Sequence, residues 1–153
     1  MRLTYMESGN ARMEDMIASV RNGLYVDEFS NGQVKIGEGD FTFYVKSGDL
    51  IENGRLTMPF KDINVIGNGP EVLENIMAVG DDLKVDDSCW TCGKDQSVAV
   101  GCGMPSVLIR ELIVIGNKVL NSCICKLLVS VIHFLNSNRK SSGCLARICY
   151  NRD

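Results

Sequence analysis

The sequence predicts an α+β domain, in which a mixed or antiparallel sheet with hairpins is accompanied by a few helices. Three observations lead to this prediction. Short β-branched or aromatic runs alternate with turn dipeptides over most of the chain. Only two stretches before Gly116 have the spacing of apolar residues that is typical of a helix lying on a core. The length of 153 residues is that of one ordinary domain with its own core.

The first predicted element is a helix that begins after Asn10 and stops at Asn22-Gly23. Asn10 is a residue type that caps helix starts, and an Asn-Gly pair is a common stop. Four apolar residues follow the spacing of one buried stripe: Met13, Met16, Ile17 and Val20. We therefore expect a scaffold helix without a catalytic role.

Two hairpins are predicted next. Asn31-Gly32 is a strong turn pair ahead of the first, whose strands are joined through Gly37-Glu38-Gly39-Asp40. The second closes at Asn53-Gly54, a dipeptide that supplies the positive φ of a tight turn. The four strand segments are residues 33–36, 41–45, 49–52 and 55–58.

A second helix is predicted to start at Pro70, because proline suits the first helical turn. It follows a strand over residues 62–66 and carries an apolar stripe as far as Val79-Gly80, formed by Val72, Leu73, Ile76 and Met77. Two β-branched runs, 107–109 and 112–115, are predicted to be central strands that complete the sheet. Arg110-Glu111 separates these two strands.

The composition of the chain changes near Gly116. Residues 1–116 carry 10 Lys and Arg against 18 Asp and Glu, whereas residues 117–153 carry 6 against 1. Of the 15 glycines, 14 precede this point, and four of the seven cysteines follow it. We interpret residues 1–116 as one domain and residues 117–153 as a tail of different origin, for example from a frame change in the coding sequence. The tail is predicted to form one extra helix over residues 119–135 and then to be irregular.

Membrane, secretory and nucleic-acid roles are not favoured. The apolar run in the tail is interrupted by polar residues and is shorter than the roughly 20 residues that span a bilayer. The first residues lack the apolar run of a signal peptide. An odd number of cysteines without regular spacing favours a reducing compartment, and hence the cytoplasm. The basic tail has no aromatic-basic pattern that would indicate nucleic-acid binding.

The densest group of chemically capable side chains lies in residues 89–105, which hold three thiols, three glycines and a proline. By itself, Cys89-x-x-Cys92 permits a zinc-ribbon knuckle or a redox pair. A ribbon requires a second close pair, and Cys123-x-Cys125 and the pair Cys144 and Cys149 both lack the usual spacing. A thioredoxin-like pair requires a helix after the second cysteine, and none is predicted there. Both remain as alternatives.

A series of motifs, read in order, carries a family resemblance. It includes Gly32-Gln33-Val34, Gly39-Asp40-Phe41-Thr42-Phe43, Ile66-Gly67-Asn68-Gly69-Pro70, Val79-Gly80-Asp81-Asp82-Leu83, Cys92-Gly93-Lys94 and Gly101-Cys102-Gly103-Met104-Pro105. Over residues 1 to about 116 the chain resembles the C-terminal part of the TldD/PmbA family, zinc metallopeptidases once called modulators of DNA gyrase. The resemblance implies the C-terminal domain of such a protein, which acts on peptides or unfolded proteins.

The resemblance also implies a zinc ligand. In TldD-like members one zinc is held by two histidines of a His-Glu-x-x-x-His helix and by the cysteine of a Cys-Gly-Lys motif, which is Cys92 here. The glutamate of that helix is the general base. This chain contains a single histidine, His133, and no such motif. The resemblance therefore implies one of three zinc ligands, no catalytic residue in this chain, and no activity of the chain alone.

Two assembly states follow from the same resemblance. Family members work as dimers, so we expect a homodimer or a heterodimer with a related subunit. The alternative function is a noncatalytic, PmbA-like subunit with a structural role at the interface with an active partner.

Some residues depart from the family pattern or have a simpler interpretation. The family has a glycine that is missing here between Asp95 and Gln96, and it has proline and valine where this chain has Ala99 and Cys102. His133 lies in an apolar run and is interpreted as a packed side chain. Three adjacent carboxylate pairs are interpreted as solvated surface: Glu14/Asp15, Asp81/Asp82 and Asp86/Asp87.

Overall fold

The computed structural model describes residues 3–35, 37–94, 96–116 and 123–129. Ten strands and two short helices are assigned within these residues: β1 (Leu3–Tyr5), α1 (Met13–Ala18), β2 (Asn22–Val34), β3 (Asp40–Glu52), β4 (Arg55–Phe60), β5 (Ile63–Asn68), α2 (Gly69–Glu74), β6 (Ile76–Val79), β7 (Lys84–Lys94), β8 (Gln96–Met104), β9 (Val107–Ile115) and β10 (Cys123–Val129). The predicted α+β class is confirmed, with strands dominant.

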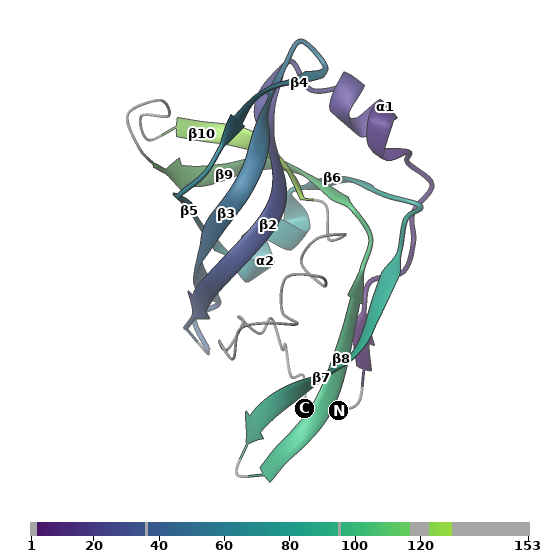
Figure 1. Cartoon of the computed structure of the whole chain (residues 1–153), viewed down its shortest axis with the longest axis vertical. Coiled ribbons are helices and arrows are strands. Elements are labelled where there is room, and N and C mark those ends of the chain that lie inside the picture. Colours follow the sequence, from purple (N-terminus) through teal and green to yellow (C-terminus); the bar gives the residue numbers. More distant parts are fainter. Residues whose placement is uncertain (1–2, 36, 95, 117–122, 130–153) are drawn as a thin grey trace.

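The strands form two sheets (Figure 1). The smaller one has the order β1-β8-β7, and the larger one has the order β10-β2-β3-β5-β9-β6, with β4 paired to β3. Because β10 pairs with β9 as well as with β2, the strands β2, β3, β5, β9 and β10 close into a ring. The larger sheet is therefore a small barrel.

The main core fills this barrel. Its buried side chains come from four of the five strands in the ring: Leu24, Val26, Phe41, Val45, Ile63, Val65, Val107, Ile109, Leu112 and Val114. Phe43 lies on the same face of β3 as Phe41 and Val45, since it packs against this cluster with its ring centroid 5.0 Å from that of Phe41. Each of these four strands thus contributes alternate residues to a single interior.

Helix α1 covers a second, smaller core. Met16 and Val20 are buried there with Ile51 and Leu108, which confirms the predicted stripe. The helix is shorter than predicted, because Arg12 occupies the N-cap position and Asn22-Gly23 already belongs to β2. Strand pairing of Asn22 with Glu52 replaces the expected stop signal.

The two predicted hairpins are present with different strand lengths. β2 and β3 are thirteen residues each and join through the predicted turn around Gly37–Gly39. Asn31-Gly32 is not a turn: it lies inside β2, opposite Tyr44 and Phe43. A Cβ on Gly32 would overlap the Phe43 ring, so the glycine serves close packing.

The turn at Asn53-Gly54 is confirmed. Both residues have positive φ, 51° and 75°, and Glu52 pairs with Arg55 across the turn. The turn is also tied to the end of α1, because the Gly54 N–H donates to the Val20 carbonyl at 2.9 Å.

The second helix begins where predicted, with Pro70 in its first turn, but it ends at Glu74. The prediction that the helix continues to Val79-Gly80 is wrong, since residues 76–79 form β6, which pairs antiparallel with β9. These residues can form backbone hydrogen bonds with β9 only in an extended conformation. Just before them, the Asn75 carbonyl accepts a hydrogen bond from the Arg110 N–H at 2.9 Å. Leu73 and Met77, expected on a buried stripe, are 61% and 48% exposed.

The two predicted strands around Arg110-Glu111 are one strand, β9, with a bulge. Against β10, Leu112 pairs with Cys125 and Ile109 with Leu127, so β9 has one extra residue between these pairs. The bulge changes the parity of burial, because Val107 and Ile109 face the main core before it and Leu112 and Val114 face it after it. Arg110 and Glu111 both stay exposed.

The predicted helix over residues 119–135 is wrong for its described part. Residues 123–129 form β10, which lies between β2 and β9 and pairs with both. Two β-branched residues in this run, Ile124 and Val129, suit a strand. The position between β2 and β9 offers hydrogen bonds on both sides. The rest of the predicted helix lies outside the described residues. No helix among the described residues is long and apolar enough to cross a membrane.

Candidate functional site

The cysteine-rich stretch forms the hairpin β7–β8, which extends away from the barrel (Figure 1). Cys92 lies in β7 close to the tip, opposite Val98 of β8. The absence of a helix after Cys92 was predicted and is confirmed, so the thioredoxin-like redox alternative is not supported. Cys92-Gly93-Lys94 is therefore presented at the end of a two-stranded arm.

The missing glycine of the family pattern falls at the tip of this arm. Lys94 pairs with Gln96, so the chain reverses around Asp95, which lies outside the described residues. The deletion follows Cys92 and shortens the turn. β7, which carries Cys92, is continuous from Lys84 to Lys94.

The base of the arm is widened by β1, which pairs parallel with β8. Gly103 of β8 pairs with Tyr5 of β1 on one side and with Val85 of β7 on the other. A Cβ at Gly103 would stand 3.0 Å from the Tyr5 Cβ and 3.0 Å from a Val85 methyl group. Gly103 thus lets the two flanking strands approach β8 closely at this position.

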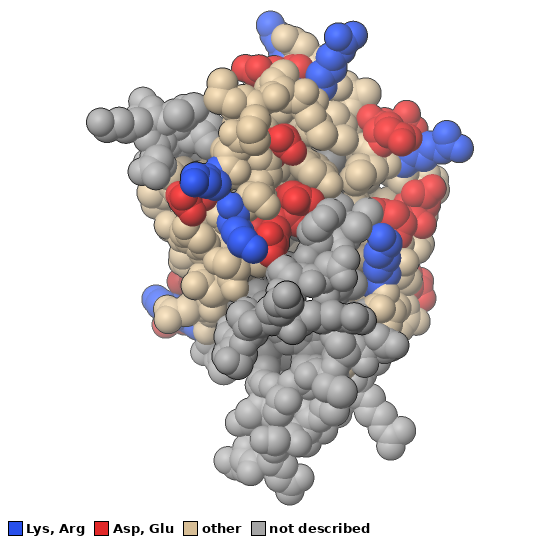
Figure 2. Space-filling model, in the orientation of Figure 1, with Lys and Arg blue, Asp and Glu red and all other residues tan. Residues whose placement is uncertain are grey.

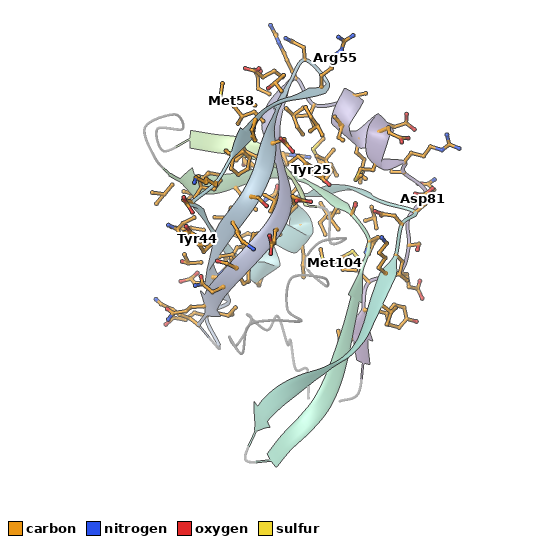
Figure 3. The ribbon with its side chains drawn as sticks, viewed as in Figure 1. Tyr25, Tyr44, Arg55, Met58, Asp81 and Met104 are labelled. Atoms are coloured by element: carbon orange, nitrogen blue, oxygen red, sulfur yellow. The ribbon has the colours of Figure 1, made fainter. Side chains whose placement is uncertain are left out.

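A carboxylate fixes the arm to the barrel. Asp82 accepts a hydrogen bond from the Ser106 backbone N–H at 2.8 Å and a second one from the Ser106 hydroxyl at 2.6 Å. Ser106 is 1% exposed and connects β8 to β9. Figure 3 labels Asp81, which directly precedes Asp82, and Met104, which lies two residues before Ser106. A buried serine with a charged acceptor is a strong local restraint.

Backbone hydrogen bonds complete the junction. The Gly80 N–H donates to the Ser106 carbonyl at 2.7 Å, and the Asp81 N–H donates to the Ala11 carbonyl at 3.0 Å. A Cβ at Gly80 would overlap an Asp82 carboxylate oxygen, so only glycine leaves room for the Asp82–Ser106 contact. The Val79-Gly80-Asp81-Asp82 motif is therefore a structural joint.

The interpretation of Asp81/Asp82 as solvated surface is correct for Asp81, which is exposed, and wrong for Asp82. Adjacent residues point in different directions, and only the second carboxylate reaches Ser106. Asp82 and Ser106 are 24 residues apart in the sequence, and no local motif links them. Glu14 and Asp15 are exposed in the first turn of α1, as predicted. The side chains of Asp86 and Asp87 lie outside the described part of the chain.

The other candidate ligands are not brought together in the described structure. Among the described residues, no three His, Cys, Asp or Glu side chains form a group that could hold a metal ion. Cys89 and Cys92 are both in β7, Cys123 and Cys125 pair with β9 instead, and His133 lies outside the description. The described residues therefore do not form a complete zinc site.

Charge on the described surface is mixed. Figure 2 shows basic side chains next to acidic ones over the described part of the visible face. Lys46 contacts Glu28 at 2.9 Å, and Lys35 contacts Glu38 at 3.3 Å. The Tyr44 hydroxyl donates a hydrogen bond to Asp62, which raises the pKa of Tyr44 above 10.0. None of these groups lies on the β7–β8 arm.

The fold and the arm define a class of domain in which a small barrel carries a two-stranded arm with a Cys-Gly-Lys motif near its tip. The family model of the PmbA/TldA metallopeptidase C-terminal domain matches residues 1–116. The chain therefore belongs to the PmbA/TldD family, as its sequence motifs indicated.

Curated relatives carry metalloprotease names. The metalloprotease TldD homolog of Buchnera aphidicola from Acyrthosiphon pisum is 45% identical over 114 residues, which are 74% of this chain and 24% of the relative. The homolog of Haemophilus influenzae is 43% identical over 116 residues, with 75% and 24% covered. The zinc metalloprotease TldD homolog of Saccharolobus solfataricus is 29% identical over 117 residues, with 76% and 26% covered. The chain thus spans about a quarter of the length of these relatives.

Solved structures agree on the fold. A proposed modulator of DNA gyrase from Bacteroides thetaiotaomicron has a TM-score of 0.57 and 28% identity, covering 74% of this chain and 23% of that one. TldE from Thermococcus kodakarensis has a TM-score of 0.52 and 17% identity, covering 82% and 23%. The second likeness concerns the fold alone.

Proposed function

We propose that this chain is the C-terminal part of a TldD-like zinc metallopeptidase that hydrolyses peptides or unfolded proteins, and that it is inactive by itself. The observation that carries the proposal is the Cys-Gly-Lys motif near the tip of the β7–β8 arm. Family membership and the metalloprotease names of relatives support it. We place the protein in the cytoplasm because of its cysteine content.

In this proposal the chain supplies the Cys92 thiolate and the rigid arm that holds it. The two histidines and the general base belong to a His-Glu-x-x-x-His segment that the sequence lacks. A zinc ion with three protein ligands retains an open position for water, which supplies the nucleophile for peptide hydrolysis. The contribution of Asp82 and Ser106 is to fix the direction of the arm relative to the barrel.

The experiment is a chimera in which this chain replaces the C-terminal quarter of the Haemophilus influenzae TldD homolog. We expect one zinc per chimera by elemental analysis and hydrolysis of an unfolded protein such as casein. Cys92→Ala should abolish both. Cys102→Ala, in the same arm but outside the Cys-Gly-Lys motif, is the matched control and should retain them. Zinc binding and hydrolysis that persist in the Cys92→Ala chimera would refute the role of Cys92.

A second candidate function is a noncatalytic, PmbA-like interaction subunit. The absence of a His-Glu-x-x-x-His motif from the sequence favours it for the chain alone. A folded chimera that binds no zinc and cleaves nothing, yet associates with a related subunit, would identify this function.

We also propose a dimer, either with a second copy or with a related subunit. Leu56 and Met58 of β4 are 44% and 54% exposed, and Figure 3 shows Met58 at the outer edge of the sheet. In the described structure β4 pairs with β3 alone. An exposed apolar edge strand is suited to association. Light scattering of the wild type and of a Leu56→Lys, Met58→Lys variant tests it, with a dimer expected only for the wild type.

A further inference from the structure

We propose that the gap between β2 and β9 is a strand-acceptor site, which β10 fills in this chain and which takes an extended apolar peptide from outside when β10 is withdrawn. The proposal is independent of the zinc site and of any peptidase activity. It concerns the barrel, at the opposite end of the molecule from the tip of the β7–β8 arm (Figure 1).

β10 forms backbone pairs on both of its sides, with β2 and with β9. Residues 126–129 pair parallel with residues 23–26 of β2, and residues 123–129 pair antiparallel with residues 107–114 of β9. The other described partner of β2 is β3, and β5 and β6 pair with β9. The β5 and β6 pairings involve separate ends of β9, whereas β10 runs along both, so β10 occupies the remaining edge. Without it, backbone donors and acceptors of two strands would have no strand partner.

The main core lies behind the gap between β2 and β9. Leu24 and Val26 of β2 are 1% and 0% exposed, and Leu112 and Val114 of β9 are 7% and 0% exposed. All four belong to the cluster inside the barrel. An open barrel would expose part of this cluster to water, so filling the gap is favoured by apolar burial as well as by hydrogen bonding.

The sequence of β10 is not part of the family match. The family match ends at residue 116, before β10 begins. The gap between β2 and β9 is thus filled here by a sequence that lies outside the family match. Pairing through main-chain groups permits this, because the hydrogen bonds do not depend on side-chain identity.

The occupant that this site fits is an extended apolar segment of about seven residues, without proline or glycine and with few charges. β10 itself has this composition: Cys123-Ile124-Cys125-Lys126-Leu127-Leu128-Val129. Because β10 has a neighbour on each side, every N–H in its paired part faces a strand. A proline there removes a ladder hydrogen bond whichever way the residue points.

The test uses the full chain with Leu127→Pro, compared with the wild type and with Ser142→Pro as a matched proline control outside β10. The probe is a fluorescent peptide with the sequence of residues 121–131 and both cysteines replaced by alanine. We expect the Leu127→Pro chain to bind this peptide about tenfold or more tightly than either control, because its own strand no longer competes. A peptide with proline at the position of Leu127 should bind to none of the three.

Hydrogen exchange provides the second measurement and keeps the test valid if Leu127→Pro fails to fold. Alternate amides of residues 23–26 point away from β3, so in the wild type we expect them to be protected as well as those that face β3. In a folded Leu127→Pro chain they should exchange rapidly and be protected again when the peptide is added. Rapid exchange of these amides in the wild type, or equal peptide binding by Leu127→Pro and wild type, would overturn the proposal.

Discussion

Asp82 is the residue that most directly controls how the Cys92 arm meets the barrel, and its contribution can be measured. Asp82→Ala removes the acceptor for two hydrogen bonds and leaves the buried Ser106 N–H and hydroxyl without it. We expect the free energy of unfolding to fall by about 2–3 kcal/mol, the range for losing a charged partner of a buried group. Urea denaturation followed by circular dichroism gives this quantity.

Ser106→Ala is the matched variant for this prediction. It removes the 2.6 Å hydroxyl bond and keeps the 2.8 Å bond from the backbone N–H, so we expect a loss of about 1 kcal/mol. A double-mutant cycle should show coupling between the two residues, since they are in contact. Equal and additive losses would mean that the Asp82–Ser106 contact does not hold the arm.

The second prediction at the residue scale concerns the pH dependence of Tyr44. Its hydrogen bond to Asp62 is the largest cause of its raised pKa, followed by burial and the charge of Asp62. Because the folded pKa lies above the ordinary value of 10.0, the hydrogen bond contributes to stability below pH 10.0, and the contribution is lost as pH rises through the folded pKa.

Absorbance titration of the phenolate near pH 10 tests this prediction, with Tyr44→Phe identifying the signal of Tyr44 by difference. Asp62→Asn is the matched variant, because asparagine tolerates the positive φ of 60° at this position and removes the charge. We expect Tyr44 to titrate at lower pH in Asp62→Asn. A Tyr44 midpoint that is the same with and without the Asp62 charge would contradict the assignment.

At the scale of single elements, the β3–β4 turn should be more sensitive than the β2–β3 turn. Gly54 has a φ of 75°, and a Cβ there would stand 2.8 Å from the Ala18 carbonyl oxygen. Gly37 has a φ of 99° with no atom within 4 Å of the position of a Cβ. Gly37→Ala therefore measures backbone strain alone, about 1 kcal/mol, whereas Gly54→Ala adds a steric clash with the end of α1.

Thermal unfolding of both alanine variants tests this difference. We expect a lower Tm for both and the larger decrease for Gly54→Ala. If the two variants lose the same stability, the contact between the turn and α1 contributes nothing.

Elements whose signals are local could be predicted from the sequence. The Asn53-Gly54 turn and the start of α2 at Pro70 depend on backbone preferences of a few adjacent residues, and both are where they were expected. The end of α2 could not be predicted, because residues 76–79 become a strand only through pairing with β9, which lies some thirty residues later in the sequence. The stripe through Val72 and Ile76 fits a helix equally well on local grounds.

The bulge in β9 is a second feature that the local sequence did not predict. Arg110-Glu111 interrupts an apolar run, and the sequence suggests two strands where the structure has one with an extra residue. Residues 107–109 and 112–115 are all apolar, so the change in parity between Ile109 and Leu112 appears only in the structure. For β10, an apolar run of this length fits a helix or a strand, and the open barrel edge that selects the strand is a property of the whole fold.

The candidate site could be predicted only in part, because a local motif can be read from the sequence and a tertiary contact cannot. The role of Cys92 as a zinc ligand stays a prediction that a short motif carries, and the structure places this residue near the tip of a hairpin. Asp82 and Ser106 were missed as a pair, since 24 residues separate them and neither belongs to a ligand motif. Contacts across the joint between two sheets depend on tertiary geometry that no local pattern encodes.

At the scale of the whole molecule, the chain consists of a closed barrel with its own core and an arm that carries one candidate zinc ligand away from it (Figure 1). Among the described residues no other ligating groups gather into a metal site. A single thiolate holds zinc weakly compared with the three or four ligands of protein zinc sites. We therefore expect the purified chain to contain far less than one zinc per molecule, measured by elemental analysis, with or without Cys92→Ala.

The zinc content distinguishes a zinc site that lacks its remaining ligands from a zinc site that is complete within this polypeptide or a second copy of it. One zinc per wild-type chain that is lost in Cys92→Ala would show that Cys92 finds further ligands in this polypeptide or in a second copy, and Cys89→Ala and His133→Ala would then identify them. Cys102→Ala controls for general effects of removing a thiol from the arm. A low zinc content in every variant, combined with one zinc in the chimera, would locate the remaining ligands outside this chain, because the same arm then binds zinc only when a His-Glu-x-x-x-His segment is supplied.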